Sequence, residues 1–105
     1  PVAEYRVVRD FAADGLVFFR IDAVDAHGTR VIACEDELTV SVRNGELVAL
    51  DNGSPVDHTP FSAPRRRLCR GSLVAIVRGG EDARIDVRLS HYKTSGLVTG
   101  SPLPK

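Results

Sequence analysis

The sequence has no tryptophan and no methionine, and its aromatic side chains are limited to two tyrosines and four phenylalanines. Sugar-binding β domains usually present flat aromatic rings, so the absence of tryptophan argues against a carbohydrate platform. A natural reading frame starts with methionine, whereas this chain of 105 residues starts with Pro1. We therefore expect it to be a piece of a longer protein.

Cysteine is scarce as well: only Cys34 and Cys69 are present. Zinc sites need closely spaced ligand pairs such as Cys-x2-Cys, and the three histidines also lie far apart in the sequence. We expect no metal and no cofactor. We favour two reduced cysteines over a structural disulfide in an exported protein.

Excess charge and long apolar runs are missing too. The chain carries 14 basic and 14 acidic residues, so it lacks the basic surface that neutralises phosphates in nucleic-acid binders. No apolar stretch approaches the roughly 20 residues that span a bilayer as a helix. We expect neither a nucleic acid nor a membrane as a partner.

Short segments rich in β-forming residues make up most of the chain, and none shows helical spacing of apolar residues. In the clearest one, Phe19, Ile21 and Ala23 alternate with polar residues, which is typical of a half-buried strand. Asn44-Gly45 predicts a two-residue hairpin turn, and a second turn is expected at residues 79–82. The pattern predicts an all-β sandwich of about seven strands in two antiparallel sheets. The expected strands are 5–9, 16–24, 29–34 (a weak strand or else an irregular connector), 38–43, 46–50, 68–78 and 84–89. They lie in one domain spanning residues 1–98, with a tail or linker at 99–105.

Residues 51–67 form a connection that is too long for a tight turn. Loops beyond about 12–15 residues are uncommon and are usually functional or disordered. In the extended segment after Pro64, Arg65 and Arg67 should share one face and Arg66 the opposite face. Such arginines can donate to the carbonyls of the loop or pair with Asp51 or Asp57. An interdomain contact is the alternative. We take the following as candidate contact residues: Asp51, Asn52, Gly53, His58, Phe61, Arg65, Arg66 and Arg67.

The sequence gives less support to metal binding, catalysis or sugar binding by this loop. Asp51, Asn52 and Asp57 could hold calcium, but their spacing matches no EF-hand, and such residues before glycine usually form turns. Asp57 next to His58 does not make a hydrolase triad, because adjacent side chains in an extended segment point apart. We expect Phe61 to pack the loop onto the sandwich; a sugar platform on Phe61 or Tyr92 is the alternative.

A family resemblance covers roughly residues 15–98. The segments 25–32, 37–42 and 45–55, followed by the run His58-x-x-Phe61-x-Ala63-x-Arg65-Arg66-Arg67, resemble the C-terminal immunoglobulin-like domain of glycoside hydrolase family 2 β-galactosidases. Ser54, Thr59 and Ala26-His27 depart from the family's usual residues. These departures weaken a metal role for the turns more than they weaken the fold prediction.

The resemblance implies an immunoglobulin-like sandwich from a bacterial β-galactosidase. The family's catalytic glutamates lie in a separate TIM barrel that this sequence lacks, so the resemblance implies that this piece is not an enzyme. It implies a structural, interdomain or cleft-shaping role, with the barrel and other β domains of the same chain as partners and self-association as a further possibility. An adhesion-type or carbohydrate-binding module is the alternative function.

Overall fold

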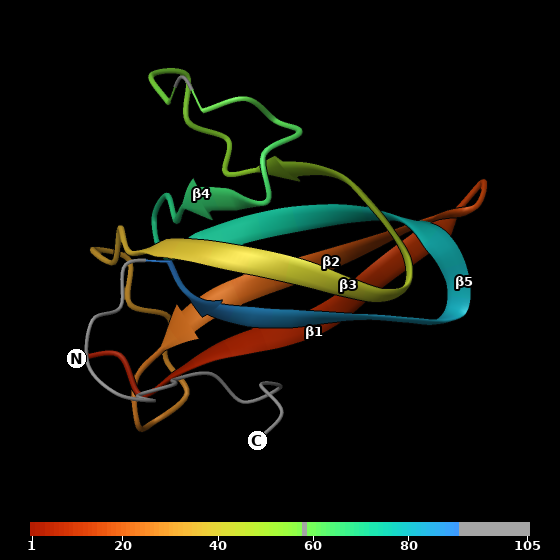
Figure 1. Ribbon diagram of the computed structural model, residues 1–105. Coiled ribbons are helices and arrows are strands. Elements are labelled where there is room, and N and C mark those ends of the chain that lie inside the picture. Colours follow the sequence, from red (N-terminus) through yellow and green to blue (C-terminus); the bar gives the residue numbers. More distant parts are fainter. Residues whose placement is uncertain (58, 91–105) are drawn as a thin grey trace.

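A computed structural model describes residues 1–57 and 59–90, so the predictions made for His58, for Tyr92 and for the tail at 99–105 lie outside the described residues. The described chain is all-β. Its five strands form one antiparallel sheet in the order β1-β2-β5-β3-β4 (Figure 1). None of the described segments is a helix of the length and apolarity that crossing a membrane requires. The strands are β1 (Glu4–Ala13), β2 (Leu16–Val24), β3 (Glu37–Asp51), β4 (Arg65–Arg67) and β5 (Ser72–Leu89).

The hairpin of β1 and β2 was predicted in part: a first strand was expected at residues 5–9, whereas β1 continues to Ala13. The predicted strand 16–24 coincides with β2, and its alternating residues Phe19, Ile21 and Ala23 are buried. Asp14 and Gly15 form the two-residue connection, with φ angles of 55° and 78°. Positive φ at both positions matches the twist of paired strands, which is why Asp-Gly suits this turn.

The two turns predicted at Asn44-Gly45 and at residues 79–82 are wrong. β3 continues through Asn44 and Gly45, and β5 continues through residues 79–82, so the two long strands stay paired from Leu38↔Leu89 to Asp51↔Val74. Asn44 takes a φ of 60°, and the register shifts between Arg43↔Arg84 and Gly45↔Gly79, so residues 80–83 of β5 have no paired partner in β3. Such an irregularity bends the paired strands, as a β-bulge does, so Asn-Gly here lies at a bend in place of a hairpin.

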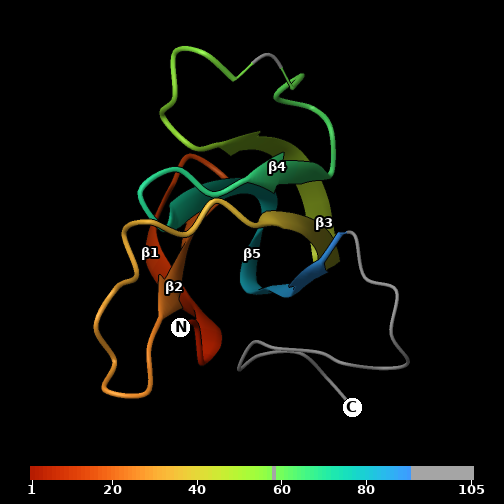
Figure 2. The same ribbon diagram turned by 90° about the vertical axis from the view of Figure 1, so that its left-hand side faces the viewer.

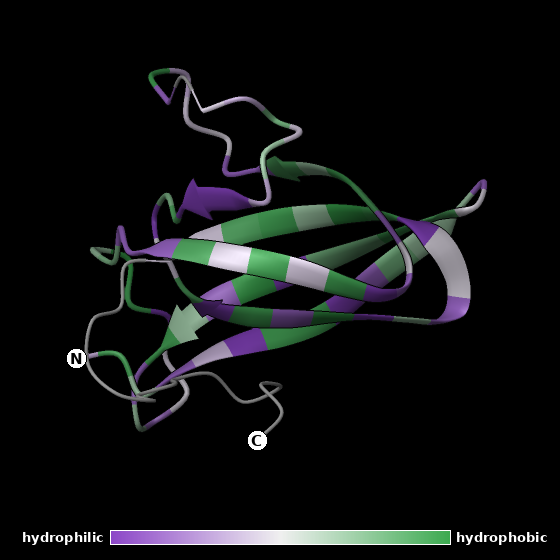
Figure 3. Cartoon of the chain, viewed as in Figure 1, coloured by the Kyte–Doolittle hydropathy of each residue, from purple (hydrophilic) through white to green (hydrophobic). Residues whose placement is uncertain are grey.

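This bend folds the sheet over its own apolar face. In Figures 1 and 2, the first half of β3 and the second half of β5 lie across β1 and β2, and together these strands enclose the core. The hydropathy colouring of Figure 3 shows apolar and polar residues alternating along the first half of β3 and the second half of β5, whereas the other halves of these strands are almost continuously apolar. One folded sheet of five strands therefore replaces the two sheets of about seven strands that the sequence predicted. The fully buried residues come from every strand, among them Tyr5, Ile21, Leu38, Leu50, Arg66, Val77 and Val87.

The segments between the strands account for two smaller differences. Residues 29–34 are an irregular connector with a single bridge, Val24↔Arg30, which is one of the two outcomes expected there. The predicted strand 68–78 starts only at Ser72, because Arg70 and Gly71 form a tight turn with φ angles of 56° and 76°. Cys34 and Cys69 are both free thiols, and Cys69 lies just before this turn and not within a strand.

Candidate functional site

The loop of residues 51–67 is anchored at both ends to β3. It leaves the end of β3, and β4 at its far end pairs with the beginning of the same strand through Glu37↔Arg67 and Thr39↔Arg65. Two further backbone bonds fix the loop: the amide of Leu50 donates to the carbonyl of Phe61 at 2.8 Å, and that of Val40 donates to Pro64 at 2.8 Å. The loop therefore forms a defined lobe beside the sheet, at the top of Figure 1.

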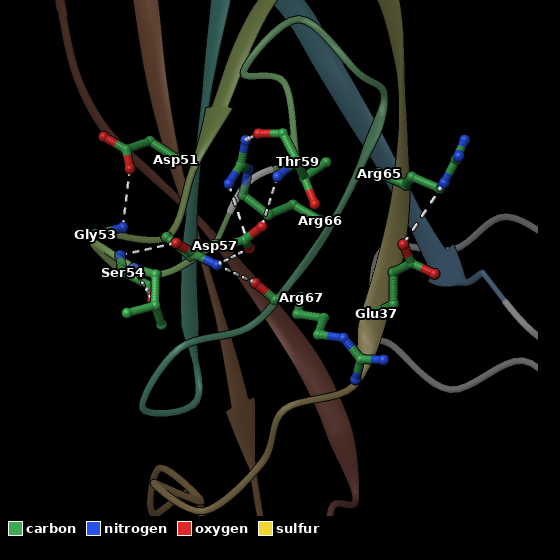
Figure 4. Close-up of polar contacts among 11 residues, drawn as sticks. Glu37, Asp51, Gly53, Ser54, Asp57, Thr59, Arg65, Arg66 and Arg67 are labelled. Carbon is green, nitrogen blue, oxygen red and sulfur yellow. Dashed lines mark hydrogen bonds and ion pairs between the residues drawn. The ribbon is translucent and has the colours of Figure 1, made fainter.

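Short polar side chains shape the interior of the loop. The carboxylate of Asp51 accepts from the amide of Gly53 at 2.8 Å, and the side-chain oxygen of Asn52 accepts from Ser54 at 2.9 Å. Asp57 accepts from the amide of Thr59 in the same way, at 2.8 Å (Figure 4). These are the turns that Asp and Asn form with the backbone two residues ahead. The turn-forming interpretation of Asp51 and Asn52 is confirmed by this geometry.

Arg66 lies in the centre of this arrangement, with only 1% of its surface exposed. Its Nη2 donates to the carbonyl oxygen of Thr59, and its Nη1 lies 3.3 Å from a carboxylate oxygen of Asp57. Its guanidinium carbon also lies 4.9 Å from the centroid of the Phe61 ring, a cation–π contact. The predicted alternation is confirmed: Arg66 points inward to the loop, while Arg65 and Arg67 are exposed.

Asp57 is the acceptor that joins the parts of the loop. Besides the Thr59 amide and Arg66, it accepts from the side-chain nitrogen of Asn52 at 2.7 Å. The hydrogen bonds from Thr59, with Asn52 and the charge of Arg66 as smaller causes, lower the pKa of Asp57 to about 2. Hydrogen bonds to the charged form favour ionisation, so Asp57 is a carboxylate across the physiological range.

The two exposed arginines hold the loop at its base. Arg65 lies 3.6 Å from the carboxylate of Glu37, and Nη1 of Arg67 donates to the carbonyl of Glu35 at 3.3 Å. The carbonyl of Arg67 in turn accepts from Asn52 at 2.8 Å. These contacts connect β4 to the loop interior on one side and to the connector before β3 on the other.

Phe61 behaves differently from the expectation that it packs the loop onto the core. Its ring remains 60% exposed, with one contact to Arg66, so the buried residue that holds the loop is Arg66. Val56 is 76% exposed on the same loop, and nothing in the sequence pattern distinguished it. An open pocket of about 320 Å³ lies beside Val56. Its lining includes Asn52, Val56, Asp57, Arg67 and Cys69.

The loop offers little for chemistry at a metal ion. Within residues 1–57 and 59–90, no three histidine, cysteine or acidic side chains gather closely enough to hold a metal ion. The carboxylates of Asp51 and Asp57 are engaged in the turns described above. The structure thus brings seven of the eight predicted contact residues together in one lobe, and His58 lies outside the described residues.

Comparison with protein families gives one match, to the model of the glycoside hydrolase family 2 C-terminal domain 5, over residues 6–97. This match spans most of the chain. The chain belongs to this family. No curated protein sequence matches it.

Solved structures similar to this C-terminal domain 5 belong to much longer chains. A family 2 member from Bacteroides cellulosilyticus aligns with 23% identity and a TM-score of 0.74, over 86% of this chain and 14% of that one. A β-glycosidase from Bacteroides vulgatus aligns with 26% identity and a TM-score of 0.66, over 86% of this chain and 12% of that one. A β-glucuronidase from Parabacteroides merdae aligns with 13% identity and a TM-score of 0.69, over 96% and 12%. The chain thus spans about an eighth of the length of these proteins.

Proposed function

We propose that this C-terminal domain 5 is a non-catalytic accessory domain of a family 2 glycosidase, and that the outer face of the 51–67 loop contacts another domain of the same polypeptide. The observation that carries the proposal is the buried Arg66. A single guanidinium, tied to Asp57 and to the Thr59 carbonyl, fixes a loop that presents Val56 and Phe61 outward.

The free-energy cost of burying Arg66 supports a functional role for the ordered loop. Burying an arginine removes its charge from water, and the ion pair with Asp57 only partly offsets that penalty. In return the loop is held in one conformation before any partner arrives, which lowers the entropy lost on binding. Exposed apolar side chains on a fixed loop are suited to a modest interdomain interface of mixed polarity.

For the parent enzyme we propose a β-galactosidase, with the TIM barrel as the neighbouring domain. The support is the run from His58 to Arg67, which resembles the corresponding run in family 2 β-galactosidases. The solved relatives are described as a β-glycosidase and a β-glucuronidase, so a β-glucuronide is the competing substrate. Hydrolysis of nitrophenyl β-galactoside and β-glucuronide by the full-length enzyme distinguishes them: faster turnover of the glucuronide contradicts the galactosidase assignment.

The interdomain contact is tested by removing the exposed apolar side chain of Val56. We expect Val56→Ser to leave the melting temperature of the isolated domain unchanged and to lower that of the full-length glycosidase, because only the latter has the interface. Ile32→Ser is the matched control, since Ile32 is a β-branched residue that is 62% exposed on a different segment. If Val56→Ser and Ile32→Ser change the full-length protein equally, the loop is not the contact surface.

A further inference from the structure

A second pocket, of about 310 Å³, opens where β1 faces the bend of β5. The apolar members of its lining, Val7, Phe19 and Ile85, are buried or half-buried and form its floor. Its charged members are exposed and form the rim: Arg9, Arg43, Glu81 and Arg84. The volume is at the small end of the range of natural small-molecule pockets, about 300–1,000 Å³.

The bend itself positions the rim. Nη1 of Arg9 donates to the carbonyl of Ala83 at 3.1 Å, and its Nη2 donates to that of Gly80 at 2.9 Å. Its guanidinium carbon lies 5.6 Å from the centroid of the Phe19 ring. Nη1 of Arg84 donates to the carbonyls of Glu81 and Ala83, both at 2.8 Å. Both arginines are therefore oriented by the backbone of the bend in β5.

Positive charge exceeds negative charge at the rim of this pocket. Arg43 is neutralised by Asp86, whose two carboxylate oxygens lie 3.0 Å and 3.3 Å from its nitrogens. Arg9 and Arg84 donate only to carbonyl oxygens, and neither has a carboxylate partner in the part of the chain that the structure describes. Glu81 supplies one negative charge on the same rim. One positive charge thus remains uncompensated beside an apolar floor.

We propose that this pocket binds a carboxylate group carried on a compact apolar body. The unengaged Nε and Nη2 of Arg84 form the planar fork that suits a carboxylate, and Phe19 and Ile85 accept the apolar part. A singly charged anion neutralises the one uncompensated charge, whereas a doubly charged phosphate leaves the pocket with an excess negative charge beside Glu81. This site uses β1, β2 and the bend, so it does not depend on the role proposed for the 51–67 loop.

Benzoate is the probe, and benzamide is its neutral counterpart of similar shape. In two-dimensional amide NMR of the isolated chain, we expect saturable shifts at residues 80–85 with benzoate and none with benzamide. Arg84→Gln should weaken benzoate about tenfold, which is the effect of losing one charge-assisted hydrogen bond. Glu81→Gln should strengthen it, because a competing negative charge is removed. A melting curve for each variant confirms that it folds.

Arg88→Gln is the control for net charge. Arg88 lies on the same strand, is exposed, and lines none of the pocket, so its replacement should leave benzoate binding unchanged. Absence of saturable binding to the unmodified chain overturns the proposal. So does an equal effect of Arg84→Gln and Arg88→Gln, which shows that only overall charge matters.

A free small acid and an acidic side chain of another domain offer the same carboxylate. Repeating the benzoate titration on the full-length glycosidase separates these two sources. Binding that is retained there assigns the pocket to a free acid. Binding that is present in the isolated chain and lost in the full-length protein assigns it to an acidic side chain that already occupies the pocket.

Discussion

At the scale of single residues, Arg66 is the group on which the order of the 51–67 loop depends most. We expect Arg66→Ala to lower the free energy of unfolding by about 3 kcal/mol, because it leaves the carboxylate of Asp57 and the Thr59 carbonyl without their buried donor. Urea unfolding followed by circular dichroism measures the change.

Arg65→Ala is the matched control for this substitution. Arg65 is exposed and only loosely paired with Glu37, so its loss should change stability by no more than about 0.5 kcal/mol. Equal effects of Arg65→Ala and Arg66→Ala would contradict the role given to Arg66.

The pKa of Asp57 predicts an acid-dependent weakening of the same loop. Because the folded state lowers this pKa from 3.8 to about 2, Asp57 contributes stability at pH values above 4 and loses it as the pH falls towards 2. The contribution should be about 1 kcal/mol after screening by solvent at the loop surface. Comparing thermal unfolding of the wild type and Asp57→Asn from pH 5 to pH 2 measures it. The stability difference should shrink over this interval; a constant difference would argue against the lowered pKa.

At the scale of elements, the bend of β3 and β5 requires a glycine at position 45. A Cβ atom on Gly45 would lie 2.7 Å from the carbonyl oxygen of Arg78 and 3.1 Å from a methyl group of Val77. We expect Gly45→Ala to cost about 1–3 kcal/mol, as other overpacked sites do. Gly80→Ala is the control, because its added Cβ meets nothing within 4 Å. A chemical denaturation series should separate the two variants, and similar unfolding midpoints would show that the bend tolerates a side chain.

The same elements show how far local sequence determines the fold. Asp14-Gly15 and Asn44-Gly45 are both strong turn sequences, yet only the first becomes a hairpin. The difference is not local: β5, with 18 residues, is long enough to pair with both halves of β3 and keeps them in one strand. Strand alternation was predictable because each side chain's face follows from its position, and the choice of partner strand was not.

The features of the candidate site also fall into those that the local sequence predicts and those that it does not. The opposite orientation of Arg66 and its two neighbours followed from alternation in an extended segment, and the turns at Asp51 and Asn52 followed from their short side chains. Which of the two faces is buried was not predictable from the alternation. The exposure of Val56 and the contact of Phe61 with Arg66 depend on where the loop returns to the sheet, which no local pattern records.

At the scale of the whole molecule, one core unites all the strands. The cluster of buried residues contains Tyr5 from β1, Phe19 from β2, Leu38 from β3 and Val77 and Val87 from the two halves of β5. We expect a single cooperative unfolding transition, with coincident midpoints in near- and far-ultraviolet circular dichroism. Two separated midpoints would indicate that the far side of the bend unfolds independently, which the shared core argues against.

The direction in which the chain enters and leaves the sheet has a mechanical consequence. The start of β1 and the end of β5 lie at the same end of the folded sheet (Figure 1), and these two strands are not paired with each other. A force that pulls these two points apart acts across the strands. It opens the hydrogen bonds of β1 to β2, and those of β5 to β3, one after another. We therefore expect this domain to unfold at low force when it is pulled from these two points. A pull along the strands would load the same hydrogen bonds together and would need a higher force.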